Sequence, residues 1–178
     1  MPSCGTVSLP MWDEMERAKR KTIRLQKYDY NSAGYYFLTF CTKGREKLLC
    51  EIVGTDVLGG PIVQLSQYGE IAERYLHGMS GFYPNIELDA YVIMPNHIHL
   101  LLKVSEVADG PSGRPVPTDA PISKFVGTFK RFCNREIGRN IWQYRSHDHV
   151  IRDEADYLKI RNYIETNPNR WVEDCFYQ

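Results

Sequence analysis

The chain has 178 residues, 43% hydrophobic and 25% charged, which is the usual balance of a globular domain large enough to bury a core. Its formal net charge is zero, so whole-chain charge excludes no class of partner and indicates none. No run approaches the ~20 apolar residues of a membrane helix, and the five widely spaced cysteines include no C-x-x-C pair, so neither a disulfide framework nor a zinc site follows. We therefore expect one soluble domain over residues 1–178, in a reducing, cytoplasmic location away from membranes.

The N-terminal part of the chain predicts a leader, three strands and a helix. Residues 1–16 are interpreted as a leader, and residues 17–27 hold six basic residues and no acidic one. Three apolar runs predict strands over residues 35–42, 48–53 and 61–65. The last two are predicted to form a hairpin. Residues 66–79 carry apolar side chains at a spacing of four, so this segment predicts a helix with Ser66 near its N-cap.

The centre of the chain predicts a pair of strands followed by a loop. Residues 86–94 and 98–104 are apolar and flank the turn-forming pair Pro95-Asn96. Residues 105–120 contain three prolines and two glycines, which is typical of a flexible loop.

The C-terminal part predicts two helices. Residues 122–138 place aromatic side chains on one face and bases on the other, and Gly138 ends the pattern. Residues 141–151 are ambiguous between loop and strand. Residues 153–167 begin with acidic residues and stop before Pro168, as a helix does. The whole order predicts an α+β fold, a ferredoxin-like antiparallel sheet with helices packed on one face.

His97 and His99 are separated by one residue on a predicted strand. Side chains alternate along a strand, so both imidazoles project to one face while Ile98 points to the core. At ~7 Å between Cα atoms, two such rings can converge on one cation. The alternative is a pair of ordinary surface histidines at the start of a strand, and the motif alone favours that alternative.

Tyr163 and Asn167 stand four residues apart on one face of the last predicted helix. A tyrosine can act as a nucleophile when its charge or its target is stabilised, and an asparagine oxygen is a hard metal ligand. The alternative is that neither residue is catalytic: Tyr163 packs against the core, and Asn167 ends the helix before Pro168.

Two combined patterns carry a resemblance to a known family. YVIMPNHIHLLL contains His97 and His99, and YIETNP contains Tyr163 and Asn167. Together they resemble the single-tyrosine HUH transposases, named for a His–hydrophobic–His motif. RKTIRLQKYDYNSAGYYFLTFCTKGRE and IWQYRSHDHVIRDEADY resemble the branch associated with repetitive extragenic palindromes (REP) of bacteria. The resemblance runs from Arg20 to Trp171 and implies a bacterial protein that works at the nucleoid.

The resemblance implies a metal site and a covalent mechanism. The ligands of Mg²⁺ or Mn²⁺ would be His97, His99 and Asn167. Tyr163 would attack a phosphodiester of single-stranded DNA, form a 5′-phosphotyrosine and release a 3′-OH. Some relatives have glutamine where this chain has Asn167, and the shorter side chain makes a bridging water an alternative to direct ligation.

Basic residues in two segments are the expected DNA contacts, because phosphate binding relies on Lys and Arg. The predicted contacts are Arg20, Lys21, Arg24, Lys27, Lys124, Lys130, Arg131, Arg135 and Arg139. Trp142 and Tyr144 are candidates for stacking on unpaired bases, with a core position as the alternative for Trp142.

The expected partner is single-stranded or hairpin DNA, bound by a monomer, with a dimer as the alternative. Two other functions stay open at this point. One is a catalytically silent protein that binds DNA or RNA hairpins on the same scaffold. The other is a metal-dependent hydrolase of small phosphoesters.

Overall fold

The computed structural model describes residues 33–55, 60–105 and 121–173. Within these ranges a four-stranded antiparallel sheet has the strand order β4-β5-β1-β6. Its strands are β1 (Gly34–Cys41), β4 (Ile86–Met94), β5 (His97–Val104) and β6 (His147–Ile151). Helix α2 (Gln67–Gly78) precedes β4, and helix α3 (Pro121–Ile137) follows β5. This order of elements and strands is the split βαβ arrangement of ferredoxin-like folds, which confirms the predicted α+β class.

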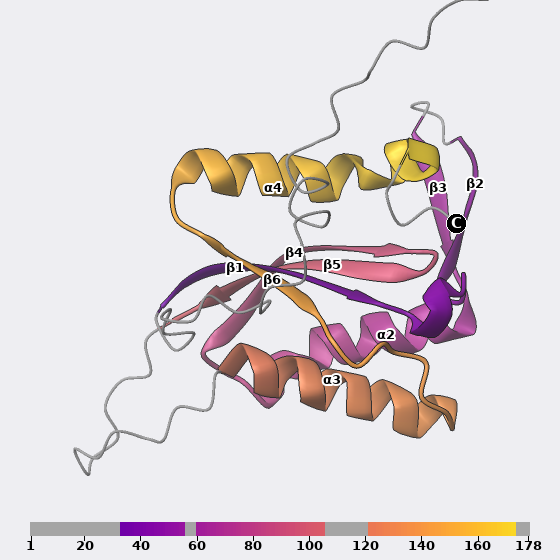
Figure 1. Ribbon diagram of the computed structural model, residues 1–178, viewed down its shortest axis with the longest axis horizontal. Coiled ribbons are helices and arrows are strands. Elements are labelled where there is room, and N and C mark those ends of the chain that lie inside the picture. The colour runs from indigo at the N-terminus through magenta and orange to yellow at the C-terminus, as the bar shows by residue number, and fades with distance from the viewer. Residues whose placement is uncertain (1–32, 56–59, 106–120, 174–178) are drawn as a thin grey trace, which may run out of the picture.

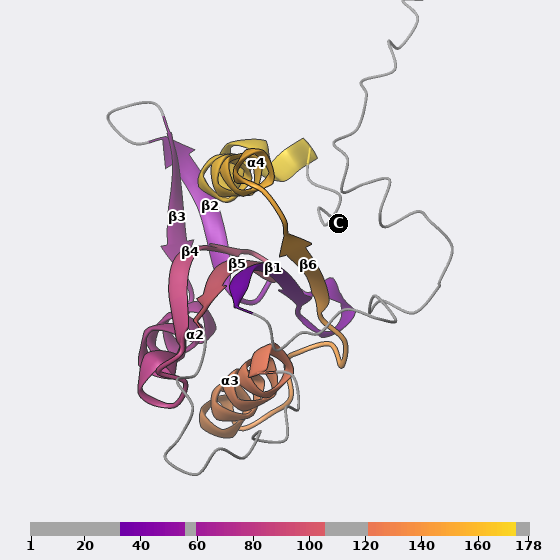
Figure 2. The same cartoon turned by 90° about the vertical axis from the view of Figure 1, so that its left-hand side faces the viewer.

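Helices cover both faces of the sheet (Figures 1 and 2). Helices α2 and α3 lie on one face of the sheet, as predicted. Helix α4 (Glu154–Thr166) lies on the opposite face, which the prediction of helices on one face did not include. The reason lies in the central strands. Alternate residues of β1 pack into two separate cores, with Leu38 and Phe40 on the α3 side and Phe37 on the α4 side. A strand that is apolar on both faces needs a cover on each.

A two-stranded hairpin stands apart from the main sheet. It consists of β2 (Cys50–Thr55) and β3 (Pro61–Leu65), as the sequence predicts, and lies beside the end of the sheet near α4 (Figure 1). Two short 3-10 turns, η1 (Lys43–Arg45) and η2 (Met79–Gly81), complete the connections before β4.

Local signals fix the ends of the helices. The Ser66 side chain accepts a hydrogen bond from the backbone N–H of Gly69, and Asp153 caps α4 by accepting from the N–H of Asp156. Gly138 has a φ of 80°, a left-handed conformation that ends α3. The ambiguous segment 141–151 contributes β6, which pairs with Tyr35–Thr39 of β1.

Several predicted features lie outside the described residues: the leader over 1–16, the basic segment 17–27 and all but the first residue of the loop over 105–120. Within the described ranges, no helix combines the length and apolar character that a membrane crossing requires.

Candidate functional site

His97 and His99 lie side by side under α4 and the turn that follows it. Ile98 points to the opposite core, as predicted from strand alternation. The two imidazole rings have centroids 4.5 Å apart and side chains 0% and 2% exposed. The interpretation of both as ordinary surface histidines is therefore wrong. Their burial comes from the helical segment that covers this face of the sheet, which the strand sequence itself does not contain.

Hydrogen bonds orient both rings. Nδ1 of His97 lies 2.9 Å from the side-chain oxygen of Asn96, which can only accept, so Nδ1 carries the proton and the buried Nε2 keeps its lone pair. Nδ1 of His99 lies 2.7 Å from the hydroxyl of Thr39, on the neighbouring strand. Both Nδ1 atoms are thus engaged, which is how protein metal sites commonly fix the ring orientation of their histidines.

Burial makes both imidazoles neutral at physiological pH. Desolvation lowers the pKa of His97 well below its ordinary value of 6.5, and repulsion from Arg45, and from His99 whenever that ring is protonated, lowers it further. Desolvation, with a smaller contribution from His147, lowers the pKa of His99 to about 3. Neutral imidazole is the form that donates a lone pair to a metal ion.

Helix α4 is attached to the sheet by polar contacts at its N-terminal half. Nε2 of His149 on β6 lies 2.8 Å from a carboxylate oxygen of Asp156. On β4, a bulge between Leu88 and Ala90 sets Asp89 out of register, and its carboxylate accepts a 2.9 Å hydrogen bond from the Tyr157 hydroxyl. These contacts fix the rotation of the helix and with it the direction of every later side chain.

Tyr163 points from α4 toward the histidines. Its hydroxyl lies 3.2 Å from Nε2 of His99, and the two ring centroids are 5.2 Å apart. Ile160 and Ile164 on either side of Tyr163 are buried against Phe37 and Leu101 of the sheet. The structure therefore brings together three of the four residues that the sequence pattern selected, with the tyrosine oxygen next to a buried ring nitrogen.

Asn167 ends α4 and begins η3 (Asn167–Glu173). Its side chain is 1% exposed, which is rare for a carboxamide at a helix end. In the same turn, the Trp171 ring lies 6.0 Å from the ring of His97. The segment that starts at Asn167 thus covers the His97 end of the site, one helical turn beyond Tyr163.

Three positioning residues escaped the sequence analysis: Thr39, Asp89 and Asp156. Thr39 is identified only by the pairing of β1 with β5, and Asp89 only by the bulge in β4. Only the His149 partner of Asp156 is marked in the sequence, because the spacing of His147 and His149 places both on one face of β6. His149 serves the attachment of α4 through its contact with Asp156.

The basic residues predicted to bind DNA divide into two groups. Arg20, Lys21, Arg24 and Lys27 lie outside the described residues. The others belong to α3 or the segment after it, on the opposite side of the sheet from Tyr163: Lys124, Lys130, Arg131, Arg135 and Arg139. Lys130 is half-buried, its Nζ donates to the backbone oxygen of Gln143, and burial lowers the pKa of Lys130 to about 8.

Comparison with known proteins gives relatives in two bacteria. An uncharacterized protein of Haemophilus influenzae is 32% identical over 173 residues, which covers 89% of this chain and 93% of that protein. A second Haemophilus influenzae protein, provisionally assigned to the REP-associated tyrosine transposases, is 28% identical and covers 79% and 73%. The REP-associated tyrosine transposase of Escherichia coli is 32% identical over 89 residues, or 49% and 48% of the two chains.

A solved structure shares the fold. It is a REP-associated tyrosine transposase bound to a REP hairpin, with a TM-score of 0.57, 22% identity, and coverage of 83% of this chain and 74% of that one. No protein-family model matches the chain. The fold, the two transposase relatives and the juxtaposition of His97, His99 and Tyr163 agree with one another. In sequence the chain is similar to REP-associated tyrosine transposases, and in fold it is similar to one of them.

Proposed function

We propose that this protein is a metal-dependent endonuclease and strand transferase that acts on single-stranded palindromic DNA folded into hairpins, through a 5′-phosphotyrosine intermediate. The observation that supports the proposal most directly is the 3.2 Å approach of the Tyr163 hydroxyl to Nε2 of His99, beside the ring of His97. Two relatives are named as transposases, and the structural relative was solved in complex with a REP hairpin. The proposed place of action is the bacterial cytoplasm, at the nucleoid.

The donor atoms fit a divalent cation. Two neutral imidazoles with engaged Nδ1 atoms can offer their Nε2 lone pairs to an ion, and His99 would exchange its 3.2 Å contact with the Tyr163 hydroxyl for the ion. The buried carboxamide of Asn167 supplies a candidate oxygen. The described residues contain no group of three or more His, Cys, Asp or Glu side chains suited to hold an ion. On the chemistry of their donor atoms, His97, His99 and Asn167 are the residues that would hold Mg²⁺ or Mn²⁺. When bound, the ion would withdraw charge from the scissile phosphate.

The chain's own residues account for the covalent step. The Tyr163 oxygen gives up its proton to solvent and attacks the phosphorus, and the bond from phosphorus to the 3′ oxygen breaks. The leaving 3′ oxygen takes up one proton, so the products are a 5′-phosphotyrosine and a free 3′-OH. Packing of α4 holds the attacking oxygen in place before the reaction, which lowers the entropic part of the barrier.

The phosphotyrosine also makes the reaction reversible. It conserves a phosphodiester, so a 3′-OH can attack it, rejoin a strand and regenerate Tyr163. Neither ATP nor an organic cofactor is needed for such a transfer.

A denaturing gel tests the proposal. The protein is mixed with Mg²⁺ or Mn²⁺ and hairpin DNA labelled on the 3′ side of the cut, and a labelled band at the mass of protein plus DNA is expected. The band should disappear with EDTA and with Tyr163→Phe. Tyr83→Phe is the matched control, because it removes a half-buried tyrosine hydroxyl that contacts Thr128 on the other side of the sheet. Hairpin binding without an adduct, with both metals and several palindromes, would instead favour a catalytically silent hairpin-binding protein.

A further inference from the structure

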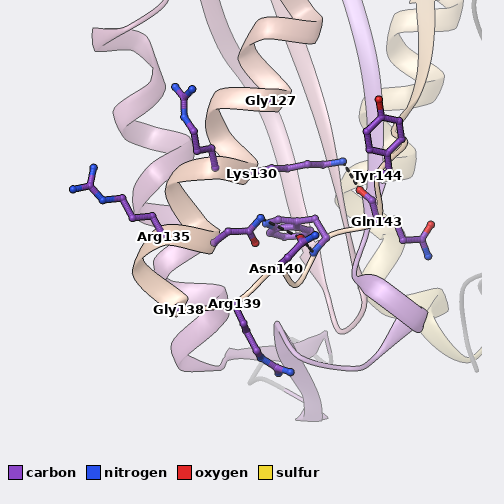
Figure 3. A pocket seen from close by; sticks show the side chains of 11 residues that line it. Gly127, Lys130, Arg135, Gly138, Arg139, Asn140, Gln143 and Tyr144 are labelled. Carbon is purple, nitrogen blue, oxygen red and sulfur yellow. Dashed lines mark hydrogen bonds between the residues drawn. The ribbon is translucent and has the colours of Figure 1, made fainter.

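The phosphate proposed to react at Tyr163 is negatively charged, whereas the basic residues predicted on and after α3 lie on the opposite side of the sheet. Figure 3 shows that surface, where Lys130 is directed to the backbone oxygen of Gln143 and Arg135 extends outward from α3. Trp142, a stacking candidate on the same side, is 2% exposed, so its core interpretation is confirmed. Within the described residues, a side-chain cation for the phosphate at Tyr163 must therefore come from another segment.

Residues 43–47 (KGREK) supply basic side chains at the His97 end of the site. The segment follows β1 and begins with η1, at the end of the sheet where β4 and β5 join (Figure 1). Just before it, the backbone N–H of Thr42 donates to the carbonyl oxygen of Asn96 at 2.9 Å. The segment is thereby fixed beside the residue that precedes His97. Its basic residues are Lys43, Arg45 and Lys47.

The buried side chain of Asn96 connects this segment to His97. Its oxygen lies 2.9 Å from Nδ1 of His97, and its nitrogen donates to the backbone oxygen of Arg45 at 3.2 Å. Asn96 is 0% exposed, so both contacts are protected from exchange with water. The carboxamide that orients a proposed metal ligand therefore also fixes the backbone of Arg45.

Arg45 has an unusual backbone conformation. Among the described residues it is the only non-glycine residue with a positive φ, 56°, and Gly44 before it has a φ of 66°. Glycine adopts this left-handed region freely, whereas a residue with a Cβ atom does so at a steric cost. Such conformations concentrate at functional sites, where the surroundings enforce them. An arginine in this position therefore points to a use for its side chain.

The charge of Arg45 reaches the site. Arg45 is half-buried, and its positive charge lowers the pKa of His97 beyond the effect of burial, so the guanidinium is within electrostatic range of that ring. Nearby, Nζ of Lys47 lies 5.9 Å from the centre of the Trp171 ring, which is 6.0 Å from the ring of His97. Positive charge thus borders the His97 end of a site whose two imidazoles are neutral. A half-buried cation attracts a phosphate more strongly than one in open water, because the local dielectric constant is lower.

We infer that the Arg45 guanidinium binds a non-bridging oxygen of the phosphate that Tyr163 attacks, and stabilises the charge that develops there during the reaction. The inference rests on the proposed function for the identity of the phosphate. Arginine suits this role because its planar group stays charged and can donate two parallel hydrogen bonds to phosphate oxygens. Arg45 would then be a catalytic residue in addition to Tyr163 and the proposed metal ligands.

Equilibrium binding in EDTA tests the contact without any cleavage. All proteins carry Tyr163→Phe, and the hairpin DNA carries one neutral methylphosphonate linkage, moved one phosphate at a time along the strand. At one phosphate, the neutral linkage should weaken binding about 10- to 100-fold when Arg45 is present and have almost no effect in Arg45→Ala. Lys43→Ala is the matched control, because it removes an exposed charge of the same turn and keeps the backbone hydrogen bond to Ile141. It should retain the full effect at that phosphate.

The rate of adduct formation tests the catalytic part, in proteins that retain Tyr163. At saturating DNA and Mn²⁺, Arg45→Gly should react about 100- to 1000-fold more slowly, and millimolar methylguanidinium should restore part of the rate. The melting temperature should not fall, because relief of the left-handed strain offsets the greater freedom of glycine in the unfolded chain. A residue with a purely structural role would show neither the rescue nor a slower reaction at unchanged stability.

Two results would overturn the inference: a methylphosphonate effect that is the same with and without Arg45 at every position, or a full rate in Arg45→Gly. An Arg45-dependent phosphate that differs from the one where the adduct maps would also overturn it. Absence of an adduct in the unaltered protein would reject the proposed catalysis, whereas the binding scan would still show whether Arg45 contacts a phosphate.

Discussion

The hydroxyl of Thr39 lies 2.7 Å from Nδ1 of His99, across the β1–β5 pair, while the hydroxyl of Tyr163 lies 3.2 Å from the other nitrogen of the same ring. One buried imidazole therefore connects the centre of the sheet to the tyrosine on α4. Loss of the Thr39 hydroxyl should weaken metal binding by His99, whereas loss of the Tyr163 hydroxyl should abolish the covalent adduct.

Thr39→Val keeps the shape of the side chain and removes its hydroxyl. Because His99 loses the partner that fixes its ring, we expect the Mn²⁺ concentration for half-maximal adduct formation to rise roughly 10- to 100-fold. A metal titration of the labelled adduct measures this. Thr39→Ser retains the hydroxyl and should stay near the original value. An unchanged metal requirement in Thr39→Val would show that the contact has no role in ligation.

Asn167 is the proposed oxygen ligand, and its replacement by Asp separates ligation from packing. A carboxylate in this buried position should lower the melting temperature in EDTA, because an unneutralised charge is costly to bury. Added Mn²⁺ should then raise the melting temperature more than in the unaltered protein, since binding to the folded state stabilises it. Asn167→Ala should show a smaller metal-induced rise than the unaltered protein. Equal rises in all three proteins would remove Asn167 from the ligand set.

Stability of the metal-free protein should fall as the pH drops below about 6.5. The folded-state pKa values of His97 and His99 are lowered, that of His99 to about 3, so the unfolded chain binds protons in this range that the folded chain does not. Stability contributed by the neutral rings is present above the unfolded pKa and is lost progressively between pH 6.5 and 3, by at most ~1.4 kcal/mol per pH unit for each ring.

Urea unfolding in EDTA at several pH values measures this dependence. The double variant His97→Gln, His99→Gln should have a shallower slope between pH 6.5 and 4.5, whereas exposed His77→Gln should keep the original slope. An unaltered slope in the double variant would assign the dependence to other groups.

The contact between His149 and Asp156 should stabilise the attachment of α4. Both side chains are less than a third exposed, so Asp156→Ala is expected to lower the free energy of unfolding by about 1–3 kcal/mol. Glu154→Ala is the control, since Glu154 lies in the same first turn but is exposed, and its loss should cost less than ~1 kcal/mol. Equal losses would mean that the His149 contact adds nothing beyond the charge at the helix N-terminus.

Much of the fold was predictable because the signals were local. Ser66, Asp153 and Gly138 mark helix ends by side-chain or backbone chemistry within one turn, and the structure places the ends there. The strand β6 (HDHVI) was ambiguous, because its conformation depends on pairing with β1. The position of α4 on the second face also depended on the whole sheet, since it required knowing that β1 is buried on both sides.

The site was predictable only in part, for the same reason. His97, His99 and Tyr163 were selected by short motifs, and the structure brings them into contact. Their burial was not predictable, because the cover comes from a helix some sixty residues later in the chain. Thr39 and Asp89 depend on strand register and on a bulge, and no single stretch of sequence contains that information.

The tyrosine that touches His99 belongs to the same chain as His99, and this sets a stoichiometry for the proposed reaction. One protein molecule stores one 5′ end, so it cannot hold both ends of an excised segment covalently at the same time. A complete exchange then needs either two molecules, each loaded with one end, or two successive rounds on one molecule, in which the first strand is resealed before the second is cut. Counting covalently bound DNA ends per protein during a single turnover would distinguish these two schedules.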